Sequence, residues 1–220
     1  MTQPLQAFVF DMDGVLIDSH GAHRQAWREF LREEGATVSE EELAFILEGR
    51  TRIEILRRFL GDLSSEELKR YGQRKDDFFR SLERQIEPIG GVLPLIERLQ
   101  QIGVTLAIAT SASRIRTFGT IERLGLTGRF DAVVTASDVE KGKPDPAVYR
   151  LTCERLKVHP SAAIAFDDAR AGVQAARSAG MRCIGVGPNG FCEQLLQAGA
   201  ETVVPNFACP EFERVAEMII

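Results

Sequence analysis

The chain has 220 residues, 44% hydrophobic and 27% charged, which is typical of a folded globular protein with one sizeable core and a smaller second unit. A formal net charge of −5, without long runs of Lys or Arg, argues against nucleic acid as the main partner. No signal-like start, bilayer-length apolar run or metal-type cysteine spacing is present, so we predict a cytoplasmic protein with free thiols and no obligate protein partner.

The first predicted strand is the apolar run Phe8-Val9-Phe10, which changes abruptly to Asp11-Met12-Asp13-Gly14. Side chains at i and i+2 of an extended backbone point the same way, so both carboxylates project together from the strand end. Such like charges repel unless a cation or a proton lies between them. The alternative is an acidic turn, because Asp and Gly are common turn residues.

Residues 15–87 have helical periodicity only. Capping boxes at Ser39–Glu42 and Ser64–Glu67 begin two of the helices. We predict helices over 22–34, from 40, over 53–60 and from 65 toward 82, forming a small bundle inserted into another domain.

From Gly90 onward, apolar strands alternate with helices of about ten residues, the pattern of βαβ units in a doubly wound parallel sheet. We therefore predict an α/β core formed by residues 1–14 and 88–220, with residues 15–87 as an inserted helical cap. The strands are expected at 104–109, 132–135, 162–166, 183–186 and 202–203, and the helices at 93–101, 114–124, 147–156, 172–179 and 191–198.

Polar residues follow four of these strands, and parallel sheets bind ligands at the carboxyl ends of their strands. They are Asp11 with Asp13, Thr110 with Ser111, Lys143, and Asp167 with Asp168. Converging carboxylates favour Mg²⁺, while a lysine and a hydroxyl suit phosphoryl oxygens. One aspartate can attack phosphorus and another can move the proton, so the arrangement predicts metal-assisted phosphoryl transfer.

Each residue also has a purely structural interpretation. Thr110 can be a β-branched strand end, Lys143 a solvated loop lysine and Asp168 a helix N-cap. Their conjunction at successive strand ends makes these interpretations improbable together.

Together these motifs resemble the haloacid dehalogenase superfamily, in the branch with an inserted helical cap. The resemblance implies Asp11 as nucleophile and Asp13 as acid/base. It implies phosphate binding by Thr110, Ser111 and Lys143, and Mg²⁺ held by Asp11, Asp13, Asp167 and Asp168. Gly172 matches a glycine of the family, whereas Ala169 departs from the Ser that follows the acidic pair in many relatives.

Within that branch the chain is similar to β-phosphoglucomutase and related sugar-phosphate phosphatases. His23, the Gly49-Arg50-Thr51-Arg52 stretch and Lys75 resemble substrate-contacting cap positions, although a solvated helix face explains such residues equally well. The resemblance favours a Mg²⁺-dependent phosphatase of a small phosphorylated metabolite. A phosphoglucomutase is the alternative, and a non-catalytic phosphometabolite-binding module is the alternative of another class.

Overall fold

The computed structural model describes residues 5–47, 52–187 and 192–219. The chain divides into two compact units, one of Met1–Ile17 with Pro88–Ile220 and the other of Asp18–Glu87. The sequence predicts the first boundary after Gly14, but the turn continues to Ile17. The Gly14 N–H donates to the Ile17 carbonyl at 2.8 Å, and Ile17 forms a β-bridge with Pro88. Gly14 has φ 73°, a left-handed conformation that glycine adopts without strain.

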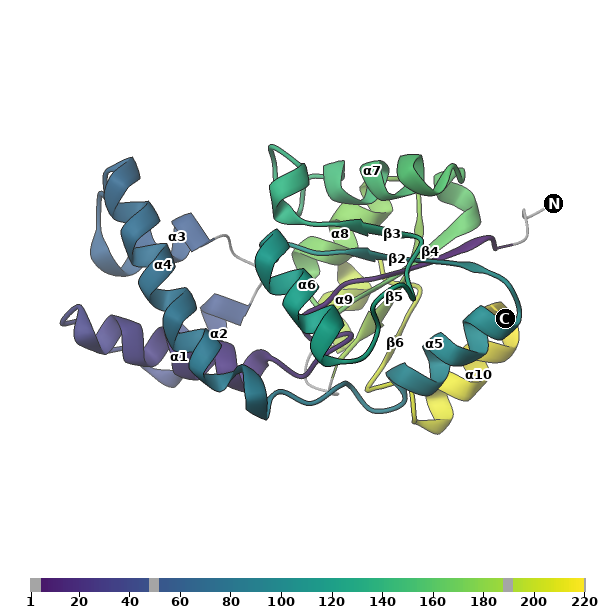
Figure 1. Cartoon of the computed structure of the whole chain (residues 1–220), viewed down its shortest axis with the longest axis horizontal. Helices are drawn as coiled ribbons and strands as arrows, with labels where there is room; N and C mark the ends of the chain where they lie inside the picture. Colours follow the sequence, from purple (N-terminus) through teal and green to yellow (C-terminus); the bar gives the residue numbers. More distant parts are fainter. Residues whose placement is uncertain (1–4, 48–51, 188–191, 220) are drawn as a thin grey trace. The chain divides into compact units, whose positions relative to one another are not determined.

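The first unit, which we call the core unit, is built on a six-stranded sheet in the order β3-β2-β1-β4-β5-β6 (Figure 1). Every neighbouring pair is parallel, which confirms the predicted doubly wound α/β fold. The strands are β1 (Ala7–Phe10), β2 (Thr105–Ala109), β3 (Ala132–Val134), β4 (Ala163–Asp167), β5 (Arg182–Val186) and β6 (Thr202–Val204). The first predicted strand, β1, is thus one of the two central strands of the sheet, beside β4.

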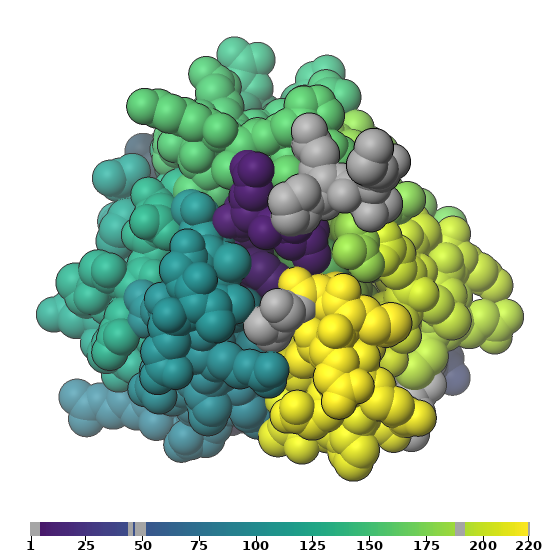
Figure 2. Space-filling model, turned by 90° about the vertical axis from the view of Figure 1, so that its right-hand side faces the viewer, coloured from purple at the N-terminus to yellow at the C-terminus, as the bar shows by residue number. Residues whose placement is uncertain are grey.

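The α-helices of the core unit connect these strands or follow the last of them. They are α5 (Val92–Gln101), α6 (Arg114–Arg123), α7 (Ala147–Leu156), α8 (Arg170–Ser178), α9 (Cys192–Gln197) and α10 (Pro210–Ile219). Figure 1 shows α5 beside α10, away from α7, and α7 packs on β2 and β3 while α8 packs on β4 and β5. In Figure 2, a view onto the amino-terminal edge of the sheet, α5 (blue-green) and α10 (yellow) again lie side by side, below the start of β1 (purple). We did not predict α10, although it buries Phe212, Val215, Ala216 and Ile219 at helical spacing.

Alternation along the central strands separates two apolar layers. Val9 and Ala165 join the buried cluster that includes Tyr149 of α7, and their neighbours in sequence face the other layer. On that other side Phe10 and Phe166 stack with ring centroids 5.1 Å apart. The same alternation directs the next residues of the first layer, at positions 11 and 167, toward α7 and α8.

The second unit, which we call the helical unit, has four α-helices among its described residues: α1 (His20–Glu33), α2 (Glu40–Leu47), α3 (Arg52–Leu60) and α4 (Ser65–Leu82). Both predicted capping boxes are confirmed. Ser39 and Glu42 exchange hydrogen bonds of 2.9 and 3.2 Å, and Ser64 and Glu67 form the same box. Gly49, Arg50 and Thr51 of the predicted cap loop lie outside the described residues. Among the described helices, none is both long and apolar enough to cross a membrane.

Candidate active site

The register between β1 and β4 brings two of the predicted aspartates together. Phe10 is paired with Phe166, so Asp11 and Asp167 occupy adjacent positions on neighbouring strands. The Asp11 N–H donates to the Phe166 carbonyl at 2.9 Å, which extends the ladder by one residue. Both side chains are buried, because they leave the sheet on the face that α7 and α8 cover.

Lys143 lies between these two carboxylates. Its Nζ donates to Asp11 Oδ1 at 2.8 Å and to Asp167 Oδ2 at 2.7 Å, and the residue is 7% exposed. The loop that follows β3 therefore directs its lysine into the sheet edge, and the interpretation of Lys143 as a solvated loop residue is wrong.

The charges of this group do not balance. Burial raises the pKa of Asp11, and the negative charges of Asp167, Asp168 and Asp13 raise it further, against the opposing effect of Lys143. Burial alone would lower the pKa of Lys143, but Asp11 and Asp167 outweigh it and raise that pKa. Lys143 neutralises only part of the negative charge of Asp11, Asp167 and Asp168, and the remaining negative charge favours a divalent cation.

Among the described residues, Asp11, Asp167 and Asp168 offer carboxylate oxygens that lie within 4.8 Å of one another. Three hard oxygen donors, two of them on buried residues, fit a divalent cation such as Mg²⁺. Asp168 does not cap the following helix, because the N-cap of α8 is Ala169.

Asp13, also predicted as a metal ligand and as the acid/base, is paired with a residue that the sequence analysis missed. Arg116 Nη1 and Nη2 donate to its two oxygens at 2.7 and 2.5 Å. Because α6 begins just after β2, an arginine in its first turn reaches the same sheet edge as Asp13. A basic residue on a helix usually indicates only a solvated face, so the position of Arg116 in the sequence did not indicate a contact with Asp13.

Thr110 and Ser111 follow β2 as predicted. Thr110 is buried, and its hydroxyl oxygen accepts a hydrogen bond from the Ala112 N–H at 3.1 Å, which shapes the turn after the strand. Ser111 is exposed. Phosphate binding by either residue stays a prediction.

Known proteins are similar to this chain over most of its length. Residues 8–186 match the family described as haloacid dehalogenase-like hydrolase. The chain belongs to this family. The validoxylamine A 7'-phosphate phosphatase of Streptomyces hygroscopicus subsp. limoneus is 31% identical over 203 residues, covering 86% of this chain and 89% of that protein. A phosphorylated carbohydrates phosphatase of Thermotoga maritima is 34% identical over 206 residues, covering 91% and 94%.

The fold of this haloacid dehalogenase-like hydrolase also matches solved structures. A crystal structure of β-phosphoglucomutase from Clostridium difficile aligns with a TM-score of 0.84 at 27% identity, covering 97% of this chain and 96% of that one. The predicted resemblance and the prediction of a phosphoryl-transfer enzyme are both confirmed.

Tyr149 is a second residue of this hydrolase that the sequence analysis missed. Its hydroxyl donates to Asp167 Oδ2 at 2.5 Å from a fully buried position on α7. Burial and the charge of Asp167 raise the pKa of Tyr149 well above its ordinary value, so the hydroxyl keeps its proton. An aromatic residue on the buried face of a helix resembles ordinary core, and only the packed structure reveals its polar partner.

Gly172 in the first turn of α8 lies directly against the Asp167 carboxylate. A Cβ at this position would lie 2.0 Å from both carboxylate oxygens. We expect Gly172→Ala to displace Asp167 and weaken divalent-cation binding by about 10-fold or more, measured by calorimetric titration of the metal-free protein.

The matched control is Gly119→Ala in α6, where an added Cβ meets nothing within 4 Å. That variant should bind the cation normally and gain up to about 1 kcal/mol of helix stability. Equal cation affinity in both variants would show that the close approach of Gly172 to Asp167 has no bearing on binding.

The helical unit brings two of its three predicted substrate residues together. Lys75 Nζ lies 3.1 Å from His23 Nδ1, and Lys75 is only 5% exposed. Arg52 donates from Nη2 to both oxygens of Asp76 at 2.8 and 2.9 Å. The interpretation of Lys75 as a solvated helix residue is therefore wrong, whereas Arg52 is exposed at the surface of its unit.

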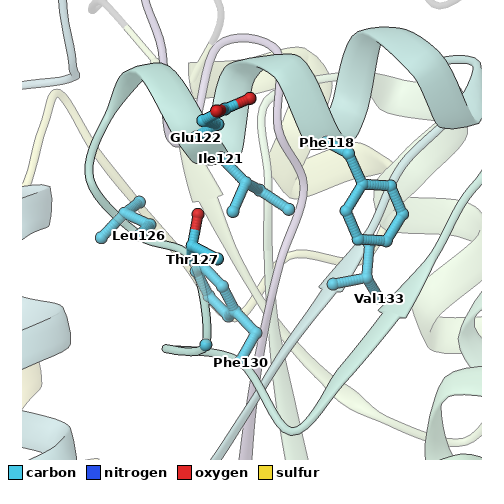
Figure 3. A pocket seen from close by; sticks show the side chains of 8 residues that line it. Phe118, Ile121, Glu122, Leu126, Thr127, Phe130 and Val133 are labelled. Atoms are coloured by element: carbon cyan, nitrogen blue, oxygen red, sulfur yellow. The ribbon is translucent and has the colours of Figure 1, made fainter.

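A pocket of about 300 Å³ lies elsewhere on the core unit, between α6 and the edge strand β3 (Figure 3). Phe118, Ile121 and Phe130 are among its lining residues, and the predicted catalytic residues are not. Because it offers no basic side chain, this pocket is unsuited to a phosphate group.

Proposed function

We propose that this haloacid dehalogenase-like hydrolase is a Mg²⁺-dependent phosphatase of a small phosphorylated metabolite, a sugar or polyol phosphate. The observation that carries the proposal is the buried Asp11 carboxylate, held 2.8 Å from Lys143 Nζ beside two further aspartates. A nucleophile, a phosphate-binding cation and a set of divalent-cation ligands then occupy one sheet edge. All four cysteines are free, in keeping with a cytoplasmic location.

In the proposed reaction an oxygen of Asp11 attacks phosphorus, and the bond from phosphorus to the leaving oxygen breaks. Asp13, freed from its ion pair with Arg116 so that its carboxyl can hold a proton, donates that proton to the leaving oxygen and then takes a proton from the water that hydrolyses the aspartyl-phosphate. Lys143, Thr110 and Ser111 hold the phosphoryl oxygens. Mg²⁺ bound by Asp11, Asp167 and Asp168 would supply positive charge against the phosphoryl group.

Asp13 as an additional metal ligand remains a prediction. We assign contacts with the leaving group to His23, Arg52 and Lys75 of the helical unit, which we propose acts as a cap that excludes water during the reaction. The contact of the buried Lys75 with the partly buried His23 supports this assignment, because a buried lysine beside an imidazole is a prepared polar site.

The names of the relatives support the substrate class. One relative is a phosphatase of phosphorylated carbohydrates and another dephosphorylates validoxylamine A 7'-phosphate. The structural match to β-phosphoglucomutase supports one alternative, a mutase that passes the phosphoryl group from Asp11 to a sugar phosphate and not to water.

The proposal is tested by measuring phosphate release from a panel of sugar and polyol phosphates, with Mg²⁺ and with EDTA. We expect release with Mg²⁺ only. A parallel reaction with β-glucose 1-phosphate and a trace of the 1,6-bisphosphate, followed by phosphorus NMR, yields glucose 6-phosphate from a mutase and free phosphate from a phosphatase. No turnover in either assay, with Mg²⁺-dependent binding of a phosphomonoester, would identify a non-catalytic binding module.

A further inference from the structure

We propose that Tyr149 is a positioning residue for the cation site: its hydroxyl fixes the Asp167 carboxylate so that Oδ1 is the oxygen presented to the cation. The inference rests on the proposed function for its cation but not for its substrate. It assigns a role to a residue whose sequence context indicates only helix core.

Within the described parts of the chain, three hydrogen bonds reach the Asp167 carboxylate from three different segments. Oδ2 accepts from Lys143 Nζ at 2.7 Å and from Tyr149 OH at 2.5 Å. Oδ1 accepts from the Ala169 N–H at 3.0 Å. Since each carboxylate oxygen offers about two acceptor sites, Oδ2 is fully used and Oδ1 keeps one site for a cation.

The donors are themselves held firmly. Tyr149 is 0% exposed on α7, which packs on β2 and β3. Lys143 Nζ lies 4.9 Å from the centre of the Tyr149 ring, so the ring contacts the ammonium group while its hydroxyl binds the carboxylate. Gly172 lies directly against the Asp167 carboxylate, and a methyl group at position 172 would overlap it. Rotation of the carboxylate would break these contacts together.

Loss of the hydroxyl alone should release this constraint. Without Tyr149 OH, Oδ2 regains an acceptor site and the carboxylate has two competing ways to meet a cation. Hydrogen-bond partners of a ligating carboxylate typically affect metal affinity by about 10- to 100-fold. We therefore expect Tyr149→Phe, which keeps the ring and its contact with Lys143, to weaken cation binding.

The experiment titrates the metal-free protein with Mn²⁺, followed by electron paramagnetic resonance, in the absence of substrate. For Tyr149→Phe we expect a dissociation constant raised by about 10-fold. The concentration of Mg²⁺ that gives half-maximal phosphatase rate should rise in parallel, while KM for the phosphomonoester at saturating Mg²⁺ stays near its original value.

The matched control is Thr152→Val on the same helix, which removes another buried hydroxyl. Thr152 Oγ1 donates at 2.7 Å to the Val148 carbonyl, a partner within its own helix. Any loss of stability through α7 should appear in both variants, but the change in Mn²⁺ affinity should appear in Tyr149→Phe alone. Unchanged or tighter Mn²⁺ binding by Tyr149→Phe, or an equal loss in Thr152→Val, overturns the inference.

A spectroscopic measurement covers the case in which Tyr149→Phe does not fold. The chain has two tyrosines, so Tyr71→Phe leaves Tyr149 as the sole reporter. Ultraviolet resonance Raman bands of this tyrosine should change on addition of Mg²⁺, because the carboxylate that accepts its hydrogen bond loses negative charge. Unchanged bands contradict the inference.

A protein that binds Mn²⁺ as described but hydrolyses no phosphomonoester would refute the proposed function and leave this inference standing.

Discussion

Asp11→Asn should lower Mg²⁺-dependent phosphate release by at least about a thousandfold, because an amide cannot replace the carboxylate that attacks phosphorus. The substitution preserves shape, so Lys143 keeps Asp167 as a partner at 2.7 Å and the sheet edge stays intact. The rate is measured at saturating substrate and Mg²⁺, together with acid-quenched trapping of labelled phosphate on the protein.

The control for this change is Asp62→Asn, the same substitution at an exposed aspartate of the helical unit. It should leave both the rate and the trapped label unchanged. Normal turnover by Asp11→Asn in the presence of Mg²⁺ would exclude Asp11 as the nucleophile and with it the proposed covalent mechanism.

Asp11→Asn should also stabilise the metal-free protein, and the gain in stability should depend on pH. Burial raises the folded-state pKa of Asp11 above its ordinary value of 3.8, so ionising Asp11 costs stability as pH rises above that value. Asn carries no charge at any pH and avoids this cost. Urea denaturation in EDTA should therefore show a gain for Asp11→Asn at about pH 8 that shrinks toward about pH 4, whereas a gain independent of pH would contradict the assignment.

The part of the site that the sequence predicts depends on backbone rules alone. Strand alternation and parallel register place Asp11 beside Asp167, and the loop after β3 supplies Lys143 to the same edge. Such rules need only the order of the strands and the polar residues that follow them. The sequence therefore predicts the acidic group and its lysine before any packing is known.

Backbone rules do not identify residues whose role in the site depends on a contact with a residue distant in sequence. Tyr149 is separated from Asp167 by 18 positions and lies among the buried residues of α7, where the pattern Val148, Tyr149, Thr152, Cys153 indicates core and nothing more. Arg116 meets Asp13 from 103 positions away. Their roles are set by how α6 and α7 pack on the sheet, which hydrophobic periodicity does not specify.

Lys143→Met should destabilise the metal-free protein by about 3–5 kcal/mol, the cost of leaving buried carboxylates without their counter-charge. The lysine is 7% exposed and contacts both Asp11 and Asp167, while methionine fills similar space without charge. Mg²⁺ should restore part of this loss, because a divalent cation can neutralise the same oxygens. Denaturant unfolding with EDTA and with Mg²⁺ measures both effects, and phosphatase activity should fall strongly even when stability is restored.

The control, Lys141→Met, removes an exposed lysine two positions earlier and should change neither quantity measurably. A comparison with Asp11→Asn makes the test sharper. Both substitutions break the same 2.8 Å ion pair, yet we expect Lys143→Met to destabilise the metal-free protein and Asp11→Asn to stabilise it. If the ion pair itself were the stabilising feature, both variants would lose stability. Opposite signs are expected if burial and the neighbouring carboxylates together disfavour the ionised form of Asp11, a cost that a divalent cation would relieve.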